Sequence, residues 1–143
     1  MGMFTSLFGE KQSYPPLPPD NYANARLREV RNELAKLASE TNQPLEVVPA
    51  EHAAYVFIGK PPKTFGFAWI HDGKVSGFKT LADEHGINPV KLQRISDDLR
   101  KVYEQSADAT RYQTQIADRD VVVTPSSALE QGVDQVIETV LAH

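Results

Sequence analysis

The dipeptide Asp72-Gly73 is the feature that most constrains how this chain can fold. It separates residues 65–71 from residues 74–78, two runs rich in β-branched and aromatic side chains. A two-residue type I′ turn needs positive φ at both positions, which Asp and Gly tolerate, so an antiparallel hairpin with a fixed register is expected. The predicted cross-strand partners are Phe67 and Phe78, Trp69 and Ser76, and Ile70 and Val75. Both faces of the hairpin then carry apolar or small residues, which predicts cover on both sides.

Further strands are expected on either side of this hairpin, from the same enrichment and alternation. Two precede it in the chain, and two follow it after a helical region at residues 79–105 that divides in two. The expected ranges are residues 45–48, 54–58, 112–116 and 120–124.

Two more helices are expected from apolar residues at helical spacing. The first covers residues 20–41 with Asp20 as its N-cap, and its apolar stripe is short enough that packing on a sheet is favoured over a coiled coil. Ser127 and Glu130 are spaced as a capping box at the start of the last helix. The two stripes consist of Ala23, Leu27, Val30, Leu34 and Leu37, and of Leu129, Val133, Val136, Ile137, Val140 and Leu141.

The order of these elements predicts an α+β fold, in which strands and helices are segregated along the chain. We expect a small antiparallel or mixed sheet of about four to six strands packed with about three to four helices. A chain of 143 residues suits one domain. The predicted organisation is a flexible proline-rich arm over residues 1–19 and a single α+β domain over residues 20–143.

The proline-rich part of that arm is a candidate partner-binding segment. Its prolines restrict φ and remove backbone donors, so polyproline II is expected, with no part in helix or sheet. Two overlapping PxxP spacings match the pattern that docks in aromatic grooves of partner domains, although a stiff spacer has the same composition. The segment consists of Tyr14, Pro15, Pro16, Leu17, Pro18 and Pro19.

Residues 80–99 show the pattern of a helix-turn-helix. Such a motif needs a small residue where its helices cross and a Gly at a left-handed turn, and Ala82 and Gly86 supply them. Asn88 is expected to cap the second helix, with Pro89 at its first position. The segment resembles the helix-turn-helix segments of DNA-binding regulators and transposase subunits. One departure is a histidine at the end of the first helix, where an apolar residue is usual.

The resemblance implies that the helix beginning at Pro89 is a recognition helix, with Lys91, Gln93 and Arg94 as candidate DNA-binding residues. Gln and Arg suit bidentate contacts with adenine and guanine. Two adjacent aspartates one turn further along would repel phosphate. The formal charge is −4, and residues 118–143 hold the whole acidic excess, so no segment carries the basic surplus typical of phosphate binding. A helical hairpin packed on the sheet explains the same residues.

Catalytic chemistry has little support in the sequence. There is no Cys, which excludes disulfides, thiolate metal sites and a cysteine nucleophile. The four His residues do not show metal-ligand spacing, and no phosphate or dinucleotide motif is present. We therefore expect no metal, no cofactor and no catalytic residues. A weaker hypothesis places a small ligand or a reaction at His71 and the aromatic strands, although these aromatics suit core packing better.

The sequence thus predicts a non-catalytic interaction or assembly domain that binds a protein partner. A helix-turn-helix DNA-binding regulator is the second hypothesis, and a small-ligand binder or enzyme is the third. We expect a cytoplasmic protein with no membrane association, because no apolar run reaches the length of a membrane span and no secretory signal is visible.

Overall fold

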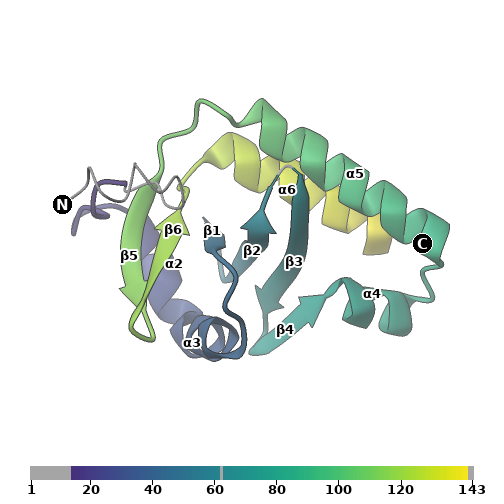
Figure 1. Cartoon of the computed structure of the whole chain (residues 1–143), viewed down its shortest axis with the longest axis horizontal. Coiled ribbons are helices and arrows are strands. Elements are labelled where there is room, and N and C mark those ends of the chain that lie inside the picture. The colour runs from purple at the N-terminus through teal and green to yellow at the C-terminus, as the bar shows by residue number, and fades with distance from the viewer. Residues whose placement is uncertain (1–13, 62, 142–143) are drawn as a thin grey trace.

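The computed structural model describes residues 14–61 and 63–141 as a mixed six-stranded sheet with helices on both faces (Figure 1). This confirms the α+β fold, with one strand pair parallel and the others antiparallel. The strands are β1 (Leu45–Ala50), β2 (Ala53–Lys60), β3 (Thr64–His71), β4 (Lys74–Gly77), β5 (Tyr112–Ile116) and β6 (Arg119–Val123). The helices are α2 (Ala23–Glu29), α3 (Arg31–Glu40), α4 (Phe78–His85), α5 (Pro89–Gln105) and α6 (Ser127–Leu141).

The strand order is β4-β3-β2-β1-β6-β5. Strands β1 to β4 form an antiparallel meander, which we call the meander. Strands β5 and β6 form a hairpin, which we call the ribbon, and it joins the meander through a short parallel pairing of β6 with β1. The registered pairs of that junction are Glu46 with Val122 and Val47 with Val123. Because β1 is central, all six of its residues are buried.

One face of the sheet is covered by α2 and α3. Helix α2 packs against β1 and β2, whereas α3 packs against β5, so this pair covers both the meander and the ribbon. Leu34 of α3 and Ile70 of β3 are almost fully buried in this layer. The expectation that the first helical region packs on a sheet is therefore confirmed.

The other face is covered by α5 and α6, which lie side by side (Figure 1). Aromatic side chains of the meander fill the layer beneath them: Phe57 is fully buried and contacts the rings of Phe65, Phe67 and Tyr103. Gly132 permits the close approach of the two helices, because a Cβ there would lie 2.6 Å from Val102 Cγ1. The predicted core role of the strand aromatics is confirmed for Tyr55, Phe57 and Phe67.

The prediction of one continuous helix over residues 20–41 with Asp20 as its N-cap is wrong in two respects. The chain breaks at Val30, which has φ −115° and ψ 13°, and this break lets α2 follow the meander while α3 turns toward β5. Asp20 does not cap the helix. The side chain of Asn21 instead accepts a hydrogen bond from the backbone N–H of Ala23 at 2.9 Å.

Two smaller predictions also change in the structure. Ser126, and not Ser127, caps α6, since its Oγ accepts from the backbone N–H of Leu129 at 3.2 Å. In the β3–β4 hairpin, the pairs Trp69 with Ser76 and Ile70 with Val75 are confirmed. The pairing of Phe67 with Phe78 is wrong, because β4 ends at Gly77 and Phe78 begins α4.

The turn between α4 and α5 has the local features that the sequence predicts. Gly86 lies in the left-handed region with φ 63°. Asn88 caps α5 by accepting from the backbone N–H of Lys91 at 2.8 Å, and Pro89 is the first helical residue. Helix α4 packs on β3 and β4, however, and α5 packs along α6. The structure thus contains a helix, a turn and a helix, and the assignment as a DNA-binding helix-turn-helix stays a prediction.

Candidate functional site

The proline-rich segment lies along the outer edge of β5, at the ribbon end of the sheet. The carbonyl of Pro15 accepts from the backbone N–H of Gln113 at 2.9 Å, and the N–H of Leu17 donates to the carbonyl of Gln113 at 3.0 Å. Pro16 forms a parallel bridge with Gln113 between these two bonds. The prediction that this segment takes no part in the sheet is therefore wrong, because proline loses its donor but keeps its carbonyl acceptor.

Side-chain contacts hold the segment at both of its ends. At the start, the backbone N–H of Tyr14 donates to Gln113 Oε1 at 3.4 Å. Leu17 packs against the core under α2 and α3. Pro18 then turns the chain toward α2, since its carbonyl accepts from Asn24 Nδ2 at 2.7 Å. Residues 1–13 lie outside the described part of the chain, so the division into arm and domain at residue 19 stays a prediction.

The candidate partner-binding residues differ in their exposure to solvent. Pro15, Pro16 and Pro19 are exposed, whereas Tyr14, Leu17 and Pro18 are half-buried. Pro16 lies in the docked part of the segment and Pro19 lies in the turn that follows, where the backbone N–H of Asn21 donates to the carbonyl of Pro18 at 3.1 Å. Binding of a partner by this segment stays a prediction.

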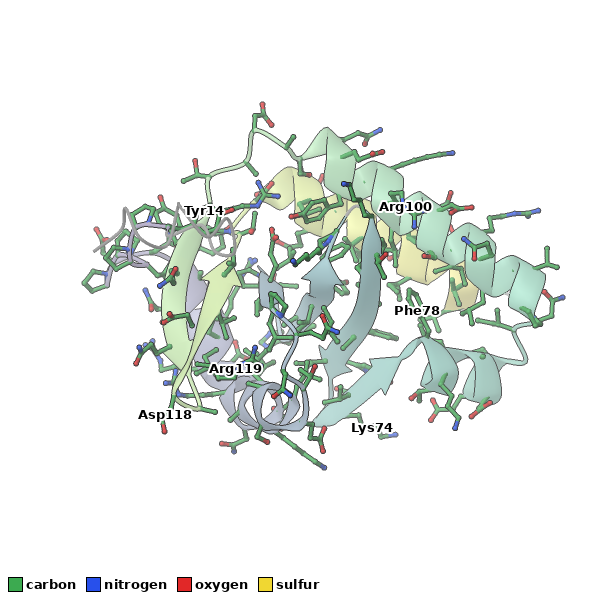
Figure 2. The ribbon with its side chains drawn as sticks, viewed as in Figure 1. Tyr14, Lys74, Phe78, Arg100, Asp118 and Arg119 are labelled. Carbon is green, nitrogen blue, oxygen red and sulfur yellow. The ribbon has the colours of Figure 1, made fainter. Side chains whose placement is uncertain are left out.

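An open groove of about 340 Å³ lies where the segment meets the ribbon. We call it the arm–edge groove; its lining consists of Tyr14, Pro16, Leu17, Gln113, Thr114, Gln115 and Asp120. Figure 2 shows Tyr14 beside the start of β5 and Asp118 at the turn where the strand ends. Asp120 is the one charged residue in the lining, and Gln115 Nε2 lies 3.4 Å from its Oδ1. The groove is thus polar and weakly acidic.

The candidate DNA-binding residues lie on the first turns of α5. Gln93 and Arg94 are exposed, and Lys91 is half-buried. Gln93 Nε2 donates to Asp97 Oδ1 at 3.1 Å, and Asp97 also accepts from Arg100 at 2.7 Å. The amide of Gln93 is therefore already used within its own helix. Contact of these three residues with DNA stays a prediction.

His71 and the aromatic strands give little support to a catalytic site. The imidazole of His71 stacks on Trp69 with ring centroids 3.7 Å apart, and its Nδ1 lies 3.4 Å from Asp72 Oδ2. Trp69 is half-buried, so this pair is a surface stack at the end of the hairpin. Within residues 14–61 and 63–141, no group of three or more His, Asp or Glu side chains is arranged to hold a metal ion.

Sequence reasoning missed a buried polar cluster at the junction between meander and ribbon. Glu46 of β1 is 8% exposed and accepts from Tyr103 at 2.6 Å, from Thr124 at 2.6 Å and from Arg111 at 2.8 Å. Arg111 also donates to the carbonyls of Ser106 and Ala109. Burial, followed by the charge and the hydrogen bond of Glu46, raises the pKa of Tyr103 well above its usual range, so the phenol remains a donor.

This cluster is a structural connection between elements. Its polar atoms satisfy one another, and among the described residues no buried side-chain nitrogen or oxygen lacks a partner. The sequence signal for it is a single carboxylate inside an otherwise apolar strand, since a buried charge requires a partner. The sequence does not say which of the fifteen basic residues is that partner.

A second arginine ties the ribbon to α3. Arg119 donates to the carbonyls of Ala38, Thr41 and Gln43 at 2.9, 2.8 and 2.6 Å. These carbonyls lie at and just beyond the end of the helix, where they have no intrahelical donor and where the dipole favours a cation. Polar links of this kind hold the ribbon that carries the arm–edge groove.

Comparison with known proteins found no matching family model, no matching curated protein and no matching solved structure. Across the described ranges, no helix is both long enough and apolar enough to cross a membrane.

Proposed function

We propose that this protein is a non-catalytic interaction or assembly domain that binds a protein partner at the arm–edge groove. The observation that carries the proposal is the docking of Pro15–Leu17 along β5, which holds a proline-rich segment extended beside an open groove. Extended segments at a sheet edge are a common mode of peptide recognition. The segment Tyr14–Pro19 forms one wall of the site, and β5 forms the other.

Preorganisation supports this role. A free proline-rich arm loses conformational entropy when it binds, whereas a segment already held by backbone hydrogen bonds loses less. The exposed Pro16 and Pro19 present apolar rings at fixed positions on the surface. A partner can therefore contact the proline rings and the polar groove together.

The test compares two surface variants of the full chain as bait in extracts of the source cells. Tyr14→Ala/Pro16→Ala removes two side chains from the groove while retaining the backbone acceptor of Pro15. The matched control is Lys74→Ala/Val75→Ala on β4, which alters two exposed residues at the opposite edge of the sheet. Bound proteins are quantified by mass spectrometry.

We expect the groove variant to lose the captured partner and the β4 variant to retain it. Circular dichroism and thermal unfolding confirm that both variants are folded. Capture of the same partner by both variants, or its loss from both, would contradict the proposed site.

A further inference from the structure

Among the residues that the structure describes, the docked segment leaves one rung of the β5 edge open. In a strand, the backbone groups of alternate residues point to the same side, so Gln115 faces the same edge as Gln113. In this parallel register the next donor after Leu17 would be Pro19, which has no N–H. The docked segment therefore cannot donate a hydrogen bond to the carbonyl of Gln115.

The antiparallel pairing of the ribbon indicates independently that the backbone groups of Gln115 face the outer edge of β5. Ile116 and Arg119 flank the two-residue turn, and a hairpin of this type closes on a hydrogen-bonded pair. Because the pairs alternate, Gln115 and Asp120 are a pair without cross-strand hydrogen bonds. The backbone groups of Gln115 thus point into the arm–edge groove, and its side chain lies next to that of Asp120.

The charge of the lining selects among ligands. Asp120 is exposed and contributes the one formal charge of the groove, so anionic ligands such as phosphates and nucleic acids are disfavoured there. Four other lining residues carry amide or hydroxyl side chains, namely Tyr14, Gln113, Thr114 and Gln115. The groove is therefore too polar for a purely apolar ligand. A polypeptide supplies the backbone donors and a cationic side chain that these groups accept.

We infer that the arm–edge groove binds an extended peptide segment that carries Lys or Arg and adds to the sheet at Gln115. The peptide backbone donates to the Gln115 carbonyl, and the basic side chain lies at Asp120. This inference rests on the proposed function and specifies the chemistry of its partner. The segment Tyr14–Leu17 occupies the first part of the β5 edge, and the bound peptide occupies the part that Pro19 leaves open.

The test is selection of a random-peptide phage library on the immobilised full chain, followed by affinity measurements with the enriched peptides. We expect enrichment of peptides with Lys or Arg. Asp120→Asn should weaken their binding about tenfold, the effect of losing one charge-assisted hydrogen bond. The control Asp118→Asn changes a neighbouring exposed carboxylate in the turn and should leave the affinity unchanged.

A second variant tests strand addition itself. Gln115→Pro removes an N–H that faces the open edge and places a ring where the peptide backbone would lie, while the bonds to β6 are retained. It should remain folded by circular dichroism and should abolish binding of the enriched peptides. Val75→Pro is the matched control, because Val75 lies on the opposite edge strand β4 one pair from its two-residue turn, where its N–H likewise faces outward, and this variant should bind normally.

Three outcomes would overturn the inference: no enriched peptide, enrichment without basic residues, or binding unaffected by Asp120→Asn and Gln115→Pro. Light scattering adds a fourth, because a concentration-dependent dimer lost in Gln115→Pro would assign this edge to a second copy of the chain. If cellular partner capture still depends on Tyr14 and Pro16, the proposed function stands although the inference about peptide chemistry fails. Loss of that dependence contradicts the proposed function itself.

Discussion

The meander and the ribbon are parts of one sheet, yet they are held in place by different forces. The meander has helices on both faces, and its central residue Phe57 is fully buried in aromatic contacts. On the side of α5 and α6, the ribbon carries half-buried or exposed side chains at Gln113, Gln115, Asp120 and Val122.

Polar links compensate for this smaller apolar contact. Glu46 and Arg111 connect the ribbon region to β1 and α5, and Arg119 connects it to α3. Apolar burial covers both faces of the meander, whereas a ribbon held by directional hydrogen bonds keeps one face accessible. The candidate binding site lies on this more accessible part of the sheet.

The largest expected difference between the two regions comes from truncating one apolar side chain in each, on the face under α5 and α6. Phe57→Ala should lower the free energy of unfolding by about 3–5 kcal/mol, because it leaves a cavity in the meander core. Val122→Ala in the ribbon should lower it by only about 0.5–1 kcal/mol, because this side chain is half-buried. Chemical denaturation measures both values. Equal losses would show that the ribbon depends on apolar packing as strongly as the meander does.

The next effect concerns the buried ion pair. Arg111→Met should lower the free energy of unfolding by about 3 kcal/mol, because it leaves the Glu46 charge without its cationic partner. Adding Glu46→Gln should recover part of that loss, which a double-mutant cycle measures. Arg31→Met, at an exposed helical position, is the control, with a change of about 0.5 kcal/mol or less. Additive effects of the two substitutions would refute the coupling.

A smaller effect is expected where α5 and α6 meet above the meander. Gly132→Ala should lower the free energy of unfolding by about 1–2 kcal/mol, because the new methyl group overlaps Val102 and the cost exceeds the gain in helix propensity. In a Val102→Ala background the same substitution should be neutral or stabilising. Destabilisation of equal size in both backgrounds would contradict the packing explanation.

The smallest effects come from the turns that close the two hairpins. Ala117 and Asp118 have φ of 54° and 63°, so the turn of the ribbon holds two non-glycine residues in the left-handed region. Ala117→Gly should raise the free energy of unfolding by about 0.5–1 kcal/mol. In the turn of the meander, Gly73→Ala should lower the free energy of unfolding by about 1 kcal/mol, because Gly73 has φ 75°, a conformation that L side chains disfavour. An added Cβ would meet no atom within 4 Å, so steric overlap does not add to this cost. Thermal unfolding that moves both proteins in the same direction would refute the backbone argument.

Local sequence patterns predicted much of the fold. The Asp72-Gly73 turn predicts the β3–β4 register, because only a small set of backbone conformations connects strands through two residues. Gly86, Asn88 and Pro89 predict the end of α4 and the start of α5 through their own φ preferences and capping chemistry. The stripe on α6 predicts its buried face, which includes Leu129 and Val133.

The candidate site was only half predictable. The composition of Tyr14–Pro19 identifies it as a candidate docking segment, but nothing local indicates that it lies on β5. The bond between Tyr14 and Gln113 joins residues separated by 99 positions in the sequence. An isolated proline-rich segment also has no donor pattern that specifies a strand partner.

What the sequence determined by itself is therefore the local chemistry: where hairpins turn, where helices begin and end, and which faces are apolar. Tertiary structure decided the parallel pairing of β1 with β6, the break at Val30, the partner of Glu46 and the groove beside Asp120. The physical reason is the distance along the sequence over which each kind of interaction acts. Dihedral preferences and capping act over a few residues, whereas strand order and buried pairs depend on which distant surfaces meet once the apolar faces leave water.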